Sequence, residues 1–224
     1  DRSRAAHRTR PNQAHADLGL GFQQQEVLVV GRADTDVVQQ DPYANAAIRG
    51  VAKAARDTHG MDVVGFFDGF TGLVENRFMP ISDELATGLL TLGGTILGTS
   101  RDKPHMMPVG NMTMDMTDVA VANYHRHHLD VLVCLGGGGT HKNAYRLMQK
   151  GLNIVTLPKT IDNDLHVTDN CPGFGSVAKY VAVSIMEASL DVESMASSST
   201  KVFILEVMGR HAGWIAAAAG LAAR

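Results

Sequence analysis

The stretch LDVLVCLGGGGT, residues 129–140, carries most of the information about the fold. Its first seven residues, Leu129–Leu135, are almost all apolar, which is typical of a short strand buried on both faces. Four glycines follow, although a tight turn needs only one or two and glycine loses the most backbone entropy on folding. Such a loop lets backbone N–H groups close on an anion at the start of a helix, expected over residues 140–150. A merely tight strand-to-helix turn is the alternative interpretation.

Apolar runs of similar length recur along the chain and alternate with amphipathic segments. Further strands are predicted at Glu26–Val30, Met61–Phe67, Leu152–Leu157 and Lys201–Val207. Helices are predicted over Tyr43–Thr58, Ser82–Leu92, Thr113–Arg126, residues 140–150, Gly175–Ser194 and from Gly213 onward. This alternation predicts an α/β fold, a Rossmann-like parallel sheet with helices on both faces. Ligands of such sheets bind beyond the carboxyl ends of the strands, so the loops after strands are the expected place for chemistry.

The loop after Leu152–Leu157 is rich in polar side chains. It reads Pro158-Lys159-Thr160-Ile161-Asp162-Asn163-Asp164 and contains two carboxylates, an amide, a hydroxyl and an ammonium group. A carboxylate on a rigid strand end can serve as the base for a hydroxyl nucleophile, and a second carboxylate can hold a metal or steer the first. The alternative is an Asx-type turn that caps the next helix. This loop alone does not decide between the two.

A third loop follows the predicted strand Lys201–Val207. It reads Met208-Gly209-Arg210-His211-Ala212-Gly213-Trp214. An arginine and a histidine flanked by glycines at a helix start suit the recognition of a sugar phosphate. His211 by itself is more often a structural histidine.

Composition restricts the classes of function. The chain has 224 residues, 45% of them hydrophobic, and a net charge of −3, which fits a globular protein with a sizeable core. This charge gives no field for nucleic acid or an anionic membrane, so we expect neither as a partner. Cys134 and Cys171 make no disulfide framework, and no signal peptide or 18-residue apolar run is visible, so cytoplasmic localisation is expected. Residues 1–26 are polar and Arg-rich, and a poorly ordered lead-in is expected there, with an arm to a neighbouring subunit as the alternative.

Three segments together are more specific than each alone. Gly136–Thr140, Pro158–Asp164 and Met208–Arg210 resemble the signature segments of phosphofructokinases, in that family's order and at roughly its spacing. Gly98-Thr99-Ser100-Arg101 is similar to the family's arginine turn near the transferred phosphate. The resemblance runs from about Ala44 to the C-terminus and implies the N-terminal portion of the phosphofructokinase fold. Glycine-rich kinases acting on NAD or diacylglycerol lack the Pro-Lys-Thr-Ile-Asp-Asn-Asp motif.

The resemblance implies a role for each matching residue. Asp162 would take the proton from the sugar 1-hydroxyl, with Thr160 and Asp164 lining the same site. Mg²⁺ would be the cofactor, held by Asp162 and Asp164. The residues facing the donor phosphates would be Gly136, Gly137, Gly138, Gly139, Thr140, Arg101 and Lys159. Those holding the sugar phosphate would be Met208, Gly209, Arg210 and Lys201. Lys201 matches a position that serves the adjoining subunit in relatives, which implies a homo-oligomer, dimer or tetramer.

Three departures from the family pattern are visible. The glycine loop of the family often has an aspartate for magnesium where this chain has Gly138. The first strand-to-helix loop, residues 31–45, lacks the family's glycines and its Pro-Gly-x-Asn end. Family members continue for a hundred or more residues beyond the point that matches Arg224. We therefore expect one α/β domain over residues 27–224, comprising the donor side and the start of the sugar-phosphate side.

The expected function is that of a 6-phosphofructokinase, moving a phosphoryl group to the 1-hydroxyl of fructose 6-phosphate in glycolysis. ATP is narrowly favoured as donor over pyrophosphate, because in this family a glycine at the position of Gly139 leaves room for the α-phosphate. Lys159 points less clearly, because an ammonium group there resembles pyrophosphate-using members but also occurs in some ATP users. Residues 171–180 look most like the pyrophosphate-dependent branch. The alternative is a non-catalytic sugar-phosphate or nucleotide-binding subunit. A Rossmann dehydrogenase is excluded, since no Gly-x-Gly-x-x-Gly follows the first predicted strand.

Overall fold

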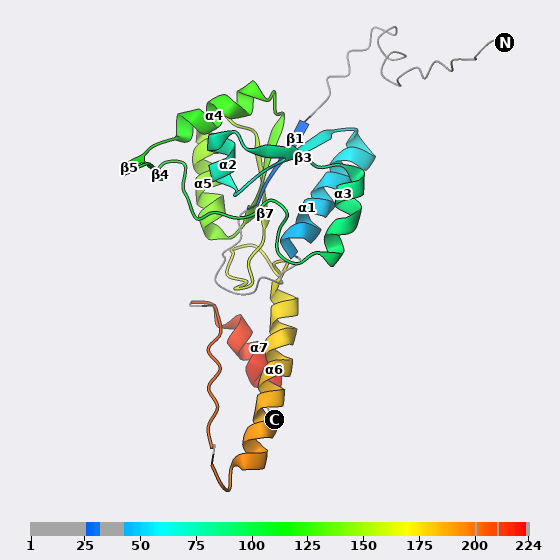
Figure 1. Cartoon of the computed structure of the whole chain (residues 1–224), viewed down its shortest axis with the longest axis vertical. Helices are drawn as coiled ribbons and strands as arrows, with labels where there is room; N and C mark the ends of the chain where they lie inside the picture. Colours follow the sequence, from blue (N-terminus) through cyan, green and yellow to red (C-terminus); the bar gives the residue numbers. More distant parts are fainter. Residues whose placement is uncertain (1–25, 32–42, 200, 210, 223–224) are drawn as a thin grey trace, which may run out of the picture.

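The computed structural model describes residues 26–31, 43–199, 201–209 and 211–222 (Figure 1). The expected lead-in, residues 1–26, lies outside them except for Glu26, as does most of the loop after the first strand. Five strands of the described chain form one sheet in the order β3-β2-β1-β6-β7. They are β1 (Glu26–Gly31), β2 (Asp62–Phe66), β3 (Phe78–Pro80), β6 (Val131–Gly136) and β7 (Ile154–Pro158). β2, β1, β6 and β7 are parallel, as predicted, and β3 pairs antiparallel with β2.

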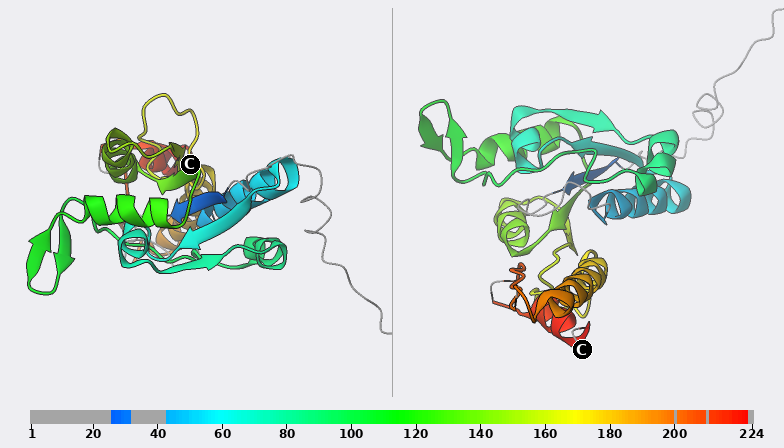
Figure 2. Two further views of the ribbon diagram at one scale, coloured as in Figure 1. Left: turned by 90° about the horizontal axis from the view of Figure 1, so that it is seen from above. Right: turned by 60° about the horizontal axis from the view of Figure 1, so that its bottom comes forward.

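Helices cover both faces of this sheet (Figures 1 and 2). One face carries α1 (Tyr43–Lys53), which continues as a π-helical turn (Ala54–Thr58), and α3 (Asp83–Gly88) with a 3₁₀ turn (Leu89–Thr91). The other face carries α2 (Phe70–Glu75), α4 (Thr117–Arg126) and α5 (Gly138–Gln149). The predicted helices over Tyr43–Thr58, Ser82–Leu92 and residues 140–150 are confirmed within a few residues.

The inner strand β6, between β1 and β7, explains why two layers of helices are needed. Leu132 and Cys134 belong to the core beneath α2, α4 and α5. Val133 and Leu135 belong to a second core beneath α1 and α3. Successive side chains of a strand point to opposite faces, so four consecutive buried apolar residues require an apolar partner on each side. The doubly covered parallel sheet follows from this pattern.

The C-terminal part of the chain extends away from the sheet (Figure 1). It consists of α6 (Phe174–Met195), an extended segment and α7 (Trp214–Ala222), which packs along α6. The predicted strand Lys201–Val207 is wrong: this segment pairs with no described strand, and its side chains, including Ile204 at 85% exposure, face solvent. A strand exists only through hydrogen bonds to a neighbour, and none of the described strands reaches this end of α6. No helix among the described residues is long and apolar enough to cross a bilayer.

A short hairpin corrects the predicted helix Thr113–Arg126 at its start. β4 (Met107–Val109) and β5 (Met112–Met114) pair antiparallel around Gly110, which has φ of 59°. The glycine supplies the positive φ that a two-residue hairpin turn requires. Helix α4 therefore starts only at Thr117, and the N–H of Thr117 donates to Asp115 Oδ1 at 2.9 Å.

Candidate functional site

The parallel strands bring their carboxyl ends to one edge of the sheet. The register pairs Val30 with Phe66, Gly31 with Leu135, and Gly136 with Pro158. The turn after β2, the glycine loop after β6 and the polar loop after β7 therefore begin at the same level. This is the edge at which ligands of open α/β sheets bind.

The glycine loop after β6 forms the N-terminus of α5. Gly137 is the N-cap residue, and its carbonyl accepts from the N–H of Thr140 at 3.0 Å and from the N–H of His141 at 3.2 Å. The ring of His141 also donates from Nδ1 to this carbonyl, at 2.8 Å. Without a side-chain cap, the first N–H groups of the helix face outward together with the positive end of its dipole. Thr140 is 1% exposed, and its Oγ1 has no hydrogen-bond partner among the described residues.

Gly138 is the position at which this chain departs from the aspartate of the family. Its φ is not positive, and a Cβ built on it would lie 3.8 Å from Leu165 Cδ2, an ordinary van der Waals contact. The backbone therefore does not require glycine here. Leu165 belongs to the loop after β7, so the same measurement places that loop beside the glycine loop.

The loop after β7 is fixed to the glycine loop through its backbone. The N–H of Lys159 donates to Gly136 O at 3.0 Å, and both Lys159 and Thr160 are buried, at 7% and 6% exposure. The N–H of Asp162 donates to Thr160 Oγ1 at 3.3 Å. The backbone of Lys159 thus lies next to the glycine loop, and Asp162 follows three residues later in the same loop.

Asn163 organises the remainder of this loop. It has φ of 51°, a left-handed conformation that asparagine tolerates better than most residues. Its Oδ1 accepts from the N–H of Cys171 at 2.8 Å, and its Nδ2 donates to Asp169 O at 3.1 Å. Burial raises the pKa of the Cys171 thiol, although the backbone N–H of Thr160 lowers it in part. Asn163 thus joins this loop to residues 169 and 171. The N-cap of α6 is Gly173, which makes no side-chain cap, so the helix-capping Asx turn is not seen among the described residues.

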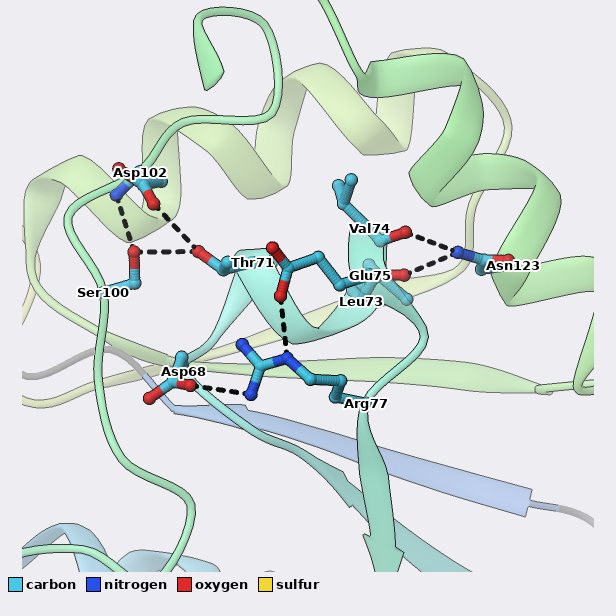
Figure 3. Close-up of polar contacts among 9 residues, drawn as sticks. All are labelled: Asp68, Thr71, Leu73, Val74, Glu75, Arg77, Ser100, Asp102 and Asn123. Carbon is cyan, nitrogen blue, oxygen red and sulfur yellow. Dashed lines mark hydrogen bonds and ion pairs between the residues drawn. The ribbon is translucent and has the colours of Figure 1, made fainter. Parts of the chain in front are cut away.

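The arginine turn, residues 98–101, lies against the turn after β2 (Figure 3). Thr71 Oγ1 lies 2.8 Å from Ser100 Oγ and 3.2 Å from Asp102 Oδ2. Thr71 and Asp68 were not predicted as supports of this turn. Asp68 lies in the loop directly after β2, where ligands of such sheets bind, so this position alone could have indicated it, whereas Thr71 lies within α2.

The third predicted loop meets the second in an open pocket of about 670 Å³. The lining residues are Asn163, Asp164, Leu165, His166, Val167, Thr168, Asp169, His211, Ala212 and Trp214. Asp164 and His211 are therefore brought together from segments far apart in the sequence. Met208 and Gly209 are half-buried just before this pocket, and the Gly209 carbonyl accepts from the N–H of Ala212 at 2.9 Å.

Two of the predicted sugar-phosphate residues are not part of this pocket. Arg210 lies outside the described residues. Lys201 is exposed in the segment that starts beyond the end of α6 farthest from the sheet (Figure 1). The structure does not bring Lys201 to the pocket of its own chain.

A sequence model of the family described as phosphofructokinase matches residues 39–224. The chain belongs to the phosphofructokinase family. An ATP-dependent 6-phosphofructokinase from Propionibacterium freudenreichii is 51% identical over 182 residues, covering 81% of this chain and 48% of that relative. A pyrophosphate–fructose 6-phosphate 1-phosphotransferase from Methylococcus capsulatus is 39% identical over 187 residues, covering 80% of this chain and 44% of that relative.

Solved phosphofructokinase structures agree with the fold. A pyrophosphate-dependent phosphofructokinase from Nitrosospira multiformis superposes with a TM-score of 0.75 at 35% identity, covering 88% of this chain and 49% of that one. The implied phosphofructokinase fold is thus confirmed. This chain spans about half the length of the curated phosphofructokinases it matches.

Proposed function

We propose that this chain contributes the phosphoryl-donor half of a 6-phosphofructokinase site, which transfers a phosphoryl group to the 1-hydroxyl of fructose 6-phosphate. One observation carries the proposal. The uncapped N-terminus of α5 and the buried Lys159 lie at the carboxyl edge of a parallel sheet, and Asp162 follows in the same loop as Lys159. These are an anion site, a cation and a base, which are the groups that phosphoryl transfer needs.

The donor phosphates bind at the glycine loop. The outward N–H groups of Gly138 and Gly139 donate to phosphate oxygens, and the buried Thr140 Oγ1 supplies a hydroxyl that lacks a protein partner among the described residues. Lys159 and Arg101 neutralise charge as it shifts toward the leaving oxygens. Because the transition state is held mainly by position and charge, these fixed donors do most of the chemical work.

Asp162 acts as the base on the acceptor. Its carboxylate takes the proton of the sugar 1-hydroxyl as that oxygen bonds to the transferred phosphorus, and the bond from phosphorus to the leaving phosphate oxygen breaks. Thr160 Oγ1 accepts from the Asp162 N–H and so holds the backbone on which the base is carried. The pocket between Asp164 and His211 lies on the acceptor side of Asp162, where Met208 and Gly209 approach and where we place the sugar phosphate.

Magnesium would be bound in this site mainly by the phosphate groups of the donor. No cluster of three or more His, Cys, Asp or Glu side chains within the described ranges could hold a metal ion, and Gly138 brings no carboxylate. Mg²⁺ commonly binds one or two carboxylates together with substrate phosphates and water. Asp162 and Asp164 are the carboxylates available for this arrangement. When bound, the ion neutralises phosphate charge.

ATP remains the narrowly favoured donor. The small Gly139 supports it by leaving room beside the loop, and the ATP-dependent relative from Propionibacterium freudenreichii is 51% identical over the matched residues. Two observations favour pyrophosphate instead. They are Lys159 and the 39% identity to the pyrophosphate–fructose 6-phosphate 1-phosphotransferase from Methylococcus capsulatus. Both cysteines are free thiols, which suits a cytoplasmic enzyme.

One assay tests the proposal directly. The 224-residue protein is incubated with fructose 6-phosphate and Mg²⁺, once with ATP and once with pyrophosphate, and fructose 1,6-bisphosphate is measured. Turnover with ATP supports the function and the donor. Turnover with pyrophosphate alone overturns the donor preference. Binding of fructose 6-phosphate without turnover with either donor favours the alternative, a non-catalytic subunit.

A further inference from the structure

One hydroxyl group contacts both neighbours of the arginine that is expected to meet the donor phosphates. Thr71 Oγ1 lies 2.8 Å from Ser100 Oγ and 3.2 Å from Asp102 Oδ2, while the Asp102 N–H donates to Ser100 Oγ at 2.9 Å (Figure 3). The three groups close a small ring of hydrogen bonds around the backbone of Arg101. The direction in which the arginine leaves the chain is therefore fixed from both sides.

A second contact holds the start of the same turn. The Asp68 N–H donates to Leu97 O at 2.6 Å, and a Cβ on Gly98 would lie 2.4 Å from Asp68 Oδ1. The other carboxylate oxygen, Oδ2, forms an ion pair with Arg77 Nη1 at 2.9 Å. Gly98 has φ of 68°, a left-handed conformation that favours glycine, and any larger residue there would also have to displace the Asp68 carboxylate.

The support beneath these contacts is rigid. Phe70, Leu73 and Val74 of α2 are buried in the core. Asn123 of α4, itself 9% exposed, donates from Nδ2 to Leu73 O and Val74 O, at 2.9 Å each. A short helix of six residues is seldom stable alone, so these tertiary contacts are what fix Thr71.

The order of the strands sets the distance between the turn after β2 and the glycine loop. β1 lies between β2 and β6, so the turn after β2 stands about two strand spacings, roughly 10 Å, from the glycine loop. The arginine turn lies against the turn after β2, so the side chain of Arg101 is long enough to span most of this gap. A small rotation of its backbone would move the guanidinium group away from the phosphates.

We propose that Thr71 and Asp68 are positioning residues that orient Arg101 toward the transferred phosphate. This inference rests on the proposed function, because it assigns Arg101 to the donor phosphates. Neither residue touches substrate. Thr71 acts on both residues that flank Arg101, and Asp68 acts on the glycine that begins the turn.

A double-mutant cycle tests the link between Thr71 and Arg101. Thr71→Val keeps the shape and removes the hydroxyl, and we expect kcat to fall on the order of tenfold. In an Arg101→Ala background the same change should alter kcat less than about twofold, because the group it positions is absent. Thr71→Ser restores the hydroxyl and should restore most of the activity. Equal losses in both backgrounds, or a Ser variant as poor as the Val variant, would overturn the proposal.

A control and a readout independent of turnover separate this inference from the proposed function. Thr87→Val removes a hydroxyl that bonds only to Asp83 O on exposed α3, and it should leave kcat unchanged. Hydrogen exchange at the Asp102 amide should accelerate at least about fivefold in Thr71→Val and stay unchanged in Thr87→Val. An inactive wild-type protein defeats the proposed function. If hydrogen exchange at the Asp102 amide is unchanged in Thr71→Val, the proposal that Thr71 positions Arg101 is wrong, whatever the activity.

Discussion

Asp162 is the residue on which the proposed chemistry depends most. Replacing it with asparagine keeps the size and removes the basic oxygen, so turnover should fall about a hundredfold or more while affinity for the sugar phosphate changes little. Steady-state kinetics with fructose 6-phosphate measure both quantities. Asp191→Asn, on the exposed surface of α6, is the matched control and should behave as wild type. Near-normal turnover in Asp162→Asn would remove Asp162 from the mechanism.

Gly138 is the position at which we expect magnesium affinity to be tunable. A carboxylate added there has space, since the nearest atom to a new Cβ is Leu165 Cδ2 at 3.8 Å. Gly138→Asp should therefore lower the magnesium concentration needed for half-maximal activity, by adding a ligand beside the donor phosphates. Gly138→Asn has the same shape without the charge and should leave this concentration nearly unchanged. An identical magnesium dependence in all three proteins would contradict the assignment.

At the scale of residues, the sequence predicted that the loops after β6 and β7 begin at the same edge of the sheet, and the register of these strands confirms it, while the roles of the side chains stay predictions. Lys159, Thr160 and Asp162 lie beside the glycine loop because parallel strands place their carboxyl ends together. The contacts of Thr71 with Ser100 and Asp102 could not be predicted, since they join segments 29 and 31 residues apart through a turn of no obvious pattern. The shared pocket of Asp164 and His211 was not predicted, since His211 by itself was interpreted as a structural histidine.

At the scale of elements, the N-terminus of α3 offers a clean test. Ser82 is its N-cap residue, and the Leu85 N–H donates to Ser82 Oγ at 3.2 Å. Ser82→Ala should lower the free energy of unfolding by about 1 kcal/mol, because one N–H of the first turn loses its partner. Ser82→Asp keeps an acceptor at the cap and should lose much less. Urea unfolding curves of the three proteins measure the difference, and equal midpoints would show that this cap contributes nothing.

The elements that sequence reasoning missed are short and depend on tertiary contacts. α2, β3 and the hairpin β4–β5 have between three and six residues each, too few for a period to be recognised. The opposite error occurred at Lys201–Val207, whose composition is that of a strand. These residues favour an extended strand, but the described residues contain no neighbouring strand with which the segment could form hydrogen bonds.

At the scale of the whole molecule, we expect self-association. Lys201 lies far from the pocket of its own chain, and apolar side chains near it are open to solvent, with Val202 at 71% and Ile204 at 85% exposure. A symmetric dimer or tetramer could bury these side chains and carry Lys201 to a neighbouring site. Sedimentation at micromolar concentration should give a dimer or larger species. Only monomer, or unchanged sugar-phosphate affinity in Lys201→Ala, would contradict this prediction.

The rate at which Cys134 on strand β6 is labelled can report how often the core of the sheet opens. Cys134 is fully buried between the sheet and the helices above it, and burial raises the pKa of its thiol to about 12. A thiol-specific reagent reacts with the thiolate and needs access to it. Cys134 can therefore be labelled only while β6 is transiently unfolded and exposed to solvent. The labelling rate of Cys134 in a Cys171→Ser variant should therefore follow unfolding and rise with urea. Rapid labelling in native buffer would mean that the core opens far more often than its packing implies.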